Sequence, residues 1–258
     1  MPRAAAALLL GASVGCGAPP PPGAVRIPAG EGVASFALDA REVSVARFRE
    51  FVAASGHRTD AEAHGWSLVF RAPGAVPEDR PSVSGAPWWT ATAEATWRHP
   101  AGPSGRPAPA DHPVVQVSWN DAAAFCAAVG GRLPTSREWA RAARGGVSDA
   151  PFPWGRRPPF VGEPQANLWD GLFPHHPGPG DGFPGLAPGA AFPSNGYGLF
   201  DMAGNVWEWV DGGTPATRPL RGGSFLCAEN SCQGYRIAWE NRAPADSAWD
   251  HTGFRCAF

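Results

Sequence analysis

The sequence lacks the excess of positive charge that a nucleic-acid-binding surface requires. Its 258 residues carry a formal net charge of −2, and charged residues make up only 17% of the chain. Such a surface needs a basic patch, so this balance argues against nucleic acid as a partner. The signatures of several enzyme classes are also missing, because no phosphate-binding loop, HExxH or H-x3-H pattern occurs.

The sequence also has no apolar run long enough to cross a bilayer as a helix. The run from Ala4 to Val14 follows Arg3 and is far shorter than the roughly 20 residues that a membrane span needs. This pattern is typical of an export signal. Residues 13–16 (SVGC) resemble a lipobox, which predicts that Cys16 is lipidated and becomes the mature N-terminus. Ordinary signal cleavage, which would discard Cys16, is the alternative.

We therefore expect an exported protein in the periplasm or at the cell surface, attached to a membrane only through a lipid if Cys16 carries one. The expected organisation is a signal peptide over residues 1–16, a Pro-rich spacer over 17–24 and one domain over 25–258.

Long regular elements are expected to be few, because the chain contains 33 Gly and 30 Pro. Full disorder is excluded by 12 Trp and 14 Phe, which are too many large apolar groups for an unfolded chain. No repeat or change of composition indicates a second domain. The sequence predicts a single loop-rich α+β domain with little regular secondary structure.

Hydrophobic periodicity and helix-capping residues predict five short elements. Strands are expected at residues 25–28 and 114–117. Helices are expected over 44–54, from about 118–120 to the glycines at 130–131, and from a capping box at 135–138 to the glycines at 145–146. Residues 71–113, rich in Pro and Gly, are expected to form a long ordered loop.

Five cysteines occur, at positions 16, 126, 227, 232 and 256. If Cys16 is lipidated or removed, four remain in an oxidising compartment, which allows two disulfides in three connectivities. For the close pair Cys227 and Cys232, composition alone favours a structural disulfide. The alternative is a metal site of two thiolates, which with no histidine nearby suits Cu(I). The spacing leaves both alternatives open.

A series of motifs resembles the formylglycine-generating enzyme (sulfatase-modifying factor) family, in order from about residue 25 to the C-terminus. They are DHPV at 111–114, VSWNDA at 117–122, RLPT at 132–135, EW at 138–139, FPWG at 152–155, NGYGL at 195–199, GNVWEW at 204–209, RGGS at 221–224 and GFRC at 253–256. Non-catalytic binding modules of the wider superfamily share each segment. GGSFLC at 222–227 with a second cysteine five residues later, and WRHP at 97–100, are similar to the enzyme branch. The resemblance implies a C-type-lectin-like fold.

The resemblance also implies the site and the reaction. Cys227 and Cys232 match the two active-site cysteines that ligate Cu(I), and Ser224 matches a nearby active-site serine. Cys126 and Cys256 match the partners of a structural disulfide. The implied reaction uses O2 to oxidise a client cysteine to formylglycine. The implied client is an unfolded or extended segment of a sulfatase, with the motif Cys-x-Pro-x-Arg, bound by a monomer.

The family binds structural Ca2+ through two loops, and the matching positions can be named in this sequence. The first loop would use Asn167, Leu168, Asp181 and Phe183, and the second Asp201, Gly204, Val206 and Glu208. Mixed side-chain and backbone oxygens suit a hard cation with six to eight ligands. The alternative is that Asp201 and Asn205 form only an Asx turn and that Glu208 is a solvated charge.

Four positions depart from the family pattern beside the cysteine pair: Ala228, Ser231, Glu240 and His251. The family usually has His, Tyr, Arg and Asn there, so we expect metal binding to survive while oxidation of a generic sulfatase peptide is slow. Two other functions stay open: a non-catalytic binding or scaffold module, which would usually lack the cysteine pair, and an oxidase for a non-sulfatase client.

Overall fold

The computed structural model describes residues 19–74, 82–178 and 180–258, so Cys16 and the expected signal peptide lie outside the described residues. Four helices are described: α1 Val45–Ser55, α2 Asp60–His64, α3 Trp119–Ala128 and α4 Ser136–Ala143. The strands are β1 Ala24–Ile27, β2 Phe36–Asp39, β3 Trp66–Phe70, β4 Ser82–Val83, β5 Ala86–Ala93, β6 Gly171–Leu172, β7 His176–Pro177, β8 Trp207–Trp209, β9 Arg218–Arg221, β10 Asn241–Ala243 and β11 Thr252–Phe254. The expected loop-rich α+β domain is confirmed.

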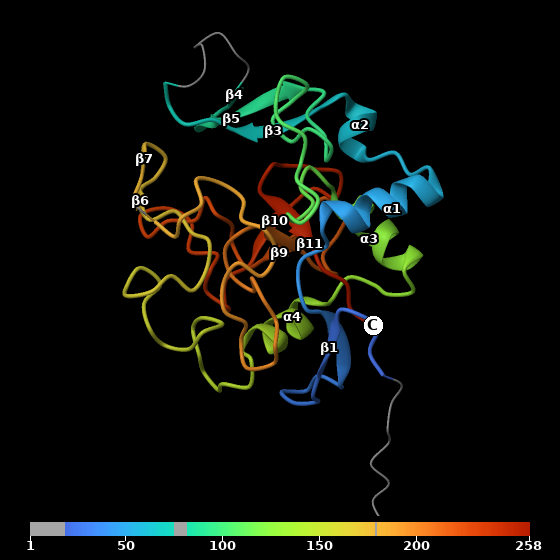
Figure 1. Cartoon of the computed structure of the whole chain (residues 1–258), viewed down its shortest axis with the longest axis vertical. Coiled ribbons are helices and arrows are strands. Elements are labelled where there is room, and N and C mark those ends of the chain that lie inside the picture. Colours follow the sequence, from blue (N-terminus) through green and yellow to red (C-terminus); the bar gives the residue numbers. More distant parts are fainter. Residues whose placement is uncertain (1–18, 75–81, 179) are drawn as a thin grey trace, which may run out of the picture.

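A four-stranded sheet in the order β10-β9-β8-β11 lies at the centre of the molecule (Figure 1). Its outer strand β11 runs parallel to β8, and the other pairs are antiparallel. A second sheet, β3-β5-β4, lies at one end, and the β1-β2 pair lies beside the C-terminus at the other. The last residues extend this pair, since the Ala37 and Phe258 backbones exchange hydrogen bonds of 2.9 and 2.8 Å. The two ends of the described chain are therefore tied together.

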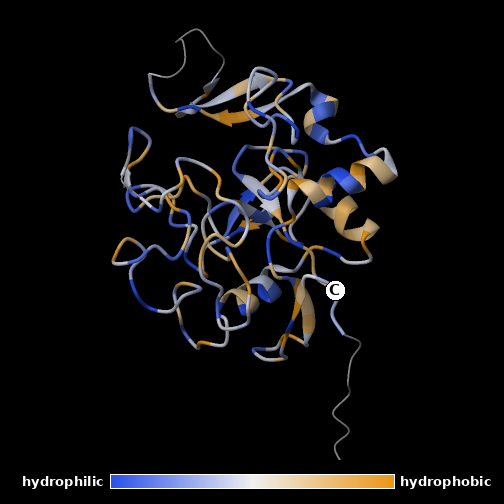
Figure 2. Cartoon of the chain, in the orientation of Figure 1, coloured by the Kyte–Doolittle hydropathy of each residue, from blue (hydrophilic) through white to orange (hydrophobic). Residues whose placement is uncertain are grey.

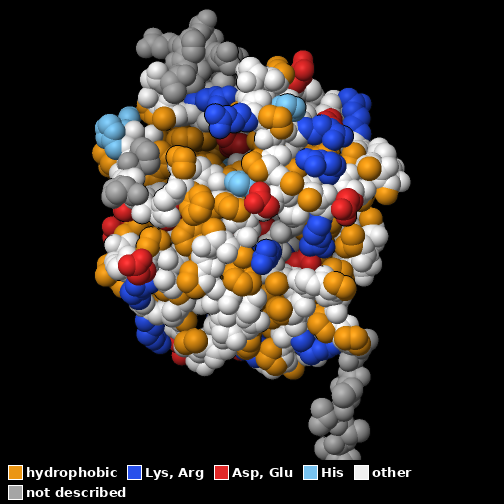
Figure 3. Space-filling model, viewed as in Figure 1, with side chains coloured by type: hydrophobic (Ala, Val, Ile, Leu, Met, Phe, Trp, Pro, Cys, Tyr) orange, Lys and Arg blue, Asp and Glu red, His pale blue; other side chains and the backbone are white. Residues whose placement is uncertain are grey.

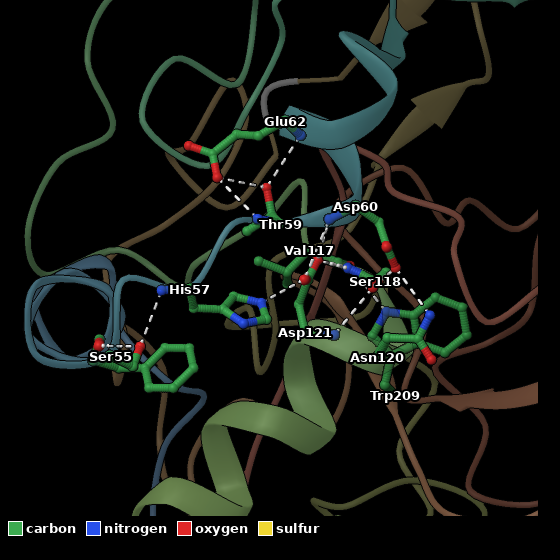
Figure 4. Close-up of polar contacts among 11 residues, drawn as sticks. Ser55, His57, Thr59, Asp60, Glu62, Val117, Ser118, Asn120, Asp121 and Trp209 are labelled. Carbon is green, nitrogen blue, oxygen red and sulfur yellow. Dashed lines mark hydrogen bonds and ion pairs between the residues drawn. The ribbon is translucent and has the colours of Figure 1, made fainter.

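The first turns of α2 and α3 are joined by a network of polar side chains (Figure 4). Ser118 caps α3 by accepting the Asp121 N–H at 3.1 Å, while Asp121 accepts the Ser118 N–H at 2.9 Å. The Ser118 hydroxyl donates to Asp60 at 2.6 Å, and His57 Nε2 lies 2.8 Å from Asp121 Oδ1. The capping box thus begins helix α3 and also holds the first turn of helix α2 against it.

Aromatic side chains fill the largest core cluster, where α1 and α3 pack on the central sheet. Phe48 contacts the rings of Trp97, Phe125 and Phe254 at centroid distances of 5.3 to 6.4 Å. Figure 2 shows α3 as mainly hydrophobic and α1 as mixed, in keeping with a helix that has one exposed face. Among the described residues, no helix has both the length and the apolar character to cross a membrane.

Four of the five expected elements form close to their expected bounds, as β1, α1, α3 and α4. The expected strand at 114–117 is wrong. Its valines are buried, but Gln116 has a φ of +59°, a left-handed conformation that interrupts an extended chain. The expected loop over 71–113 is wrong in part, because it contains β4 and β5. Their partner β3 and helix α2 have no counterpart in the sequence-based expectation.

Candidate functional site

Cys227 and Cys232 lie together in a turn that follows β9, with their Cα atoms 4.7 Å apart, and the structure joins them as a disulfide. The backbone N–H of Ser224 donates to Cys227 Sγ at 3.4 Å, and the Ser224 carbonyl accepts the Cys227 N–H at 2.9 Å. Ser224 and Cys227 are buried, whereas Cys232 is partly exposed. The three residues expected at the catalytic site are therefore adjacent in space.

Two glycines make this turn possible. Gly223 has a φ of +73°, which side chains rarely adopt, and a Cβ there would lie 2.7 Å from the Tyr235 backbone nitrogen and 3.2 Å from Cys227 Sγ. A Cβ on Gly234 would collide with the indole ring of Trp207. Close packing around the Cys227 sulfur thus requires glycine at position 223, and packing against Trp207 requires it at position 234.

The donor atoms of this turn suit a soft metal ion. Once reduced, the two cysteines would offer two thiolates on one turn, a set that suits Cu(I). The Ser224 N–H already points at one of these sulfurs, that of Cys227. Within the described parts of the chain, no group of three His, Cys, Asp or Glu side chains is placed to hold a metal. The cysteine pair is the site that fits the expected copper, which stays a prediction.

One wall of the turn is aromatic. Trp169 and Phe173 pack with the buried Leu226 and Ala228, and the backbone N–H of Trp169 donates to the Cys227 carbonyl at 3.1 Å. Asn230 exchanges two hydrogen bonds with the Phe173 backbone, at 3.2 and 3.3 Å. Ala228, where the family usually has His, therefore completes an apolar wall.

The other departures from the family pattern have different surroundings. Ser231 is exposed. Glu240 accepts the Ser136 hydroxyl at 2.6 Å and pairs with Arg242 at 2.6 Å, so its charge is balanced internally. His251 lies between Trp89 and Trp249, at ring distances of 4.6 and 6.2 Å, and burial lowers its pKa to about 3. This imidazole is therefore neutral at physiological pH.

The first predicted calcium loop is brought together by Asp181. Its carboxylate accepts the N–H groups of Leu168 and Phe183 at 2.9 and 3.0 Å, and burial raises the Asp181 pKa. The Asn167 amide donates to the Gly185 carbonyl at 2.8 Å. All four predicted residues therefore lie together around one carboxylate.

The second predicted loop is arranged differently. Asp201 and Gly204 have positive φ angles of 54° and 76°, and Asp201 accepts the Ala190 N–H at 2.6 Å. Glu208 is buried and bonded through both oxygens to Arg255, at 2.7 and 2.8 Å. The alternative that Glu208 is a solvated charge is therefore wrong. A cation bound by Glu208 would have to share its carboxylate with Arg255, so this loop fits calcium less well than the first.

Glu42 is a buried acid that the sequence-based expectation missed. It accepts the Asn205 side-chain amide at 2.8 Å and the Val206 N–H at 3.4 Å. Burial, followed by the nearby charges of Asp201 and Glu208, raises the pKa of Glu42 well above its usual value. Position 42 lies in a mixed stretch with no motif, so no sequence signal pointed to it.

The second disulfide lies away from the cysteine turn. Cys126 of α3 is bonded to Cys256, which follows β11, with Cα atoms 5.5 Å apart and both residues buried. This is the pairing that the family resemblance implies.

Comparison with known proteins gives one family and several close relatives. The model of the sulfatase-modifying factor enzyme 1-like domain matches residues 19–258. The formylglycine-generating enzyme of Thermomonospora curvata is 45% identical over 86% of this chain and 81% of its own length. That of Bos taurus is 42% identical over 86% of this chain, and the match covers 65% of the bovine protein. A Mus musculus relative that is 45% identical over 87% of this chain and 75% of its own length is named inactive C-alpha-formylglycine-generating enzyme 2.

Among solved structures, PvdO from Pseudomonas aeruginosa matches with a TM-score of 0.59, covering 87% of this chain and 80% of that one. Its sequence identity of 21% supports a shared fold alone.

Proposed function

This chain belongs to the sulfatase-modifying factor enzyme 1-like family, and from that membership we propose that it oxidises a client cysteine to formylglycine, using copper and dioxygen. Relatives at 42–45% identity are named formylglycine-generating enzyme, which supports an enzymatic role in activating sulfatases. The observation that carries the proposal is the turn in which Ser224, Cys227 and Cys232 meet.

In the proposed reaction, the client cysteine loses two electrons and two hydrogens to give a thioaldehyde. Water then replaces the sulfur, which leaves as hydrogen sulfide, and the aldehyde remains. Dioxygen accepts four electrons in becoming water, so two further electrons must come from an external thiol reductant. Copper, when bound by Cys227 and Cys232, supplies the one-electron chemistry that dioxygen activation needs.

The residues of the turn have separate tasks in this proposal. Cys227 is buried and fixed by the Ser224 N–H, so it anchors the site. Cys232 is partly exposed, so in this proposal a client sulfur approaches the site at this residue. The Ser224 hydroxyl accepts the Leu226 N–H at 3.3 Å, and its proton stays available to orient a polar group of the client.

The proposed client is an extended cysteine-containing segment of a sulfatase, because a folded segment could not bring its cysteine to a turn between loops. We also propose export of the protein. Two disulfides in the described residues are consistent with an oxidising compartment. The lipid anchor on Cys16 stays a prediction.

Copper competition with a chromogenic Cu(I) chelator tests the proposal. Cys227→Ser and Cys232→Ser should each abolish tight binding by the reduced protein, because one thiolate holds Cu(I) poorly against competing thiols. Ser231→Ala, an exposed change in the same turn, is the matched control and should bind as the parent does. Parent-like affinity in either cysteine variant would restore the structural disulfide as the better interpretation.

A non-catalytic binding module is the second candidate, favoured by the relatives that are named inactive. Mass spectrometry of a Cys-x-Pro-x-Arg peptide incubated with the copper-loaded protein separates the two. Aldehyde formation that depends on Cys232 supports the oxidase. Copper binding without turnover on sulfatase or other client peptides would support the module.

A further inference from the structure

A cavity of about 400 Å³ opens beside the segment that leads to Cys227. Phe225 forms part of its wall, and Val69, Val115, Leu186 and several prolines line much of the remainder. Consecutive Cα atoms are about 3.8 Å apart, so the Phe225 Cα lies within about 8 Å of the Cys227 Cα. The cavity is therefore within reach of a peptide that presents its cysteine to the turn.

The proline-rich wall determines how a peptide could bind there. Pro107, Pro109 and Pro113 have no backbone N–H, so this wall cannot donate a ladder of hydrogen bonds to an added strand. Fixed proline rings instead present a stiff apolar surface, and pockets of this size and lining bind apolar groups. Recognition in this cavity must therefore depend on a buried side chain.

The charged groups of the cavity are mostly basic. Arg71 donates to the neutral Ala101 carbonyl at 3.0 Å, and Arg106 is exposed and has no ion-pair partner among the described residues. His112, also at the wall, is bonded to Asp111 at 3.0 Å. Figure 3 shows basic side chains beside hydrophobic ones around a hollow below the β3–β5 sheet, with acidic atoms at its floor.

Asp250 is the acid of the cavity, and it offsets this positive charge only in part. Its Oδ2 accepts the Phe70 N–H at 2.9 Å, and its Oδ1 is shut off from solvent without a partner among the described residues. Burial raises the Asp250 pKa to about 7, so near neutral pH the carboxyl is uncharged in about half of the molecules. The two arginines therefore leave the cavity entrance positive.

We propose that this cavity is a client subsite that takes an apolar side chain with an acidic residue next to it, within about four residues of the reactive cysteine. The inference rests on the proposed function for the identity of the occupant. Its evidence is separate, because it depends on the apolar wall and on Arg71 and Arg106, and not on the metal.

Peptide binding without turnover tests this subsite. The probes are fluorescent peptides in which Ser replaces the reactive cysteine, with Leu-Asp, Leu-Lys or Ala-Asp placed three residues to either side. Anisotropy should show that Leu-Asp binds about two- to fivefold more tightly than Leu-Lys, the usual effect of one exposed charge pair. The Leu-Asp peptide should also bind about tenfold more tightly than Ala-Asp, because the Ala-Asp peptide has no leucine to bury in the cavity.

Charge reversal identifies the basic group. Arg106→Glu should invert the preference so that Leu-Lys binds better than Leu-Asp, whereas Arg49→Glu, an exposed change on α1 outside the cavity, should leave the preference unaltered. Equal binding of all three peptides, or no binding by any, would overturn the subsite. The subsite would also be refuted if Arg106→Glu and Arg49→Glu changed the preference between Leu-Asp and Leu-Lys by the same amount.

The competing occupant is a free amphiphilic acid. Displacement of the probe by decanoate at lower concentrations than by unlabelled Leu-Asp peptide would assign the cavity to such a ligand and refute the client subsite. Because no probe contains cysteine, these results do not depend on copper. A failure of the oxidase proposal and a failure of the subsite are therefore distinguishable.

Discussion

Removing the negative charge of Glu208 should strongly destabilise the domain. Both of its oxygens bind Arg255, and one also accepts the Trp139 indole N–H at 2.7 Å. Arg255 and Glu208 are 0% and 1% exposed. Glu208→Gln would leave a buried guanidinium with no negative partner, one amide oxygen in place of two carboxylate oxygens, and backbone carbonyls such as that of Phe200 at 2.9 Å. Breaking such a pair on one side typically costs about 3–5 kcal/mol.

The neighbouring acid reduces this cost. The charge of Glu208 helps to raise the pKa of Glu42, so its loss makes Glu42 easier to ionise and lets that residue balance Arg255 in part. We therefore expect the lower half of the range, about 3–4 kcal/mol. At about 2–4 °C per kcal/mol for a domain of this size, the melting temperature should fall by roughly 6–16 °C.

Denaturant titration and thermal melting, each with calcium and with a chelator, measure the effect. The double variant Glu208→Leu with Arg255→Met should recover much of the loss, because both charges disappear together. If Glu208 acts only as an ion-pair partner, the loss is the same in both buffers. A loss that is larger in calcium would show that Glu208 is a ligand as well. A loss below about 1 kcal/mol in both buffers would refute the reasoning, since it is the size expected of a surface pair.

Four further predictions concern stability and turnover. Replacing Cys126 and Cys256 with Ala should lower the free energy of unfolding by up to about 5 kcal/mol in denaturant titrations, because the bridge links positions 130 residues apart. Parent-like Cu(I) affinity is expected in that variant. The raised pKa of Asp250 means that the folded chain binds more protons than the unfolded one between about pH 4 and 7. The contribution of Asp250 to the free energy of unfolding should fall with rising pH across that window by up to about 1.4 kcal/mol per unit, and the difference in stability between the parent and Asp250→Asn should show this slope. The lowered pKa of His251 has the opposite effect, because the unfolded chain binds a proton there that the folded chain does not. The stability that the neutral imidazole contributes is therefore lost as pH falls from about 6.5 towards 3, and His251→Gln should remove this loss. Glu240→Arg should lower the melting temperature without speeding aldehyde formation, because it places a third guanidinium beside two arginines. Faster turnover with unchanged melting would contradict this.

The features that the sequence predicted correctly are those that depend on residues close together in the chain, such as the starts of helices. The helices α3 and α4 start at Ser118 and Thr135, where capping boxes satisfy the first N–H groups, and these starts could be assigned from residues three apart. Pairing between distant segments could not be assigned in this way. β5 lies within the stretch whose Pro and Gly content indicated a loop, and it forms a sheet with β3, which precedes that stretch. The left-handed Gln116 is held by distant contacts, its N–H bonding to the Trp249 carbonyl at 2.9 Å.

The candidate site was found by resemblance more than by spacing. The interval between Cys227 and Cys232 left a disulfide and a metal site both open, and the motif order around it indicated the family. Neither the family resemblance nor residue spacing pointed to Glu42, because it is an isolated acid in a mixed stretch with no motif. Its importance comes from Asn205 and Val206, which lie 163 and 164 residues away in sequence and bond to it in the folded chain.

The two interpretations of the cysteine turn are two chemical states of one geometry. Two thiolates in this turn would repel each other, so a reduced pair without metal is expected to keep a proton on at least one sulfur. A disulfide removes both charges, and a bound monovalent cation reduces a charge of −2 to −1 while holding both sulfurs. The disulfide and the proposed copper-bound dithiolate each avoid the repulsion between two neighbouring thiolates. If copper binds here as proposed, the redox conditions and the copper supply would decide which of these two states predominates.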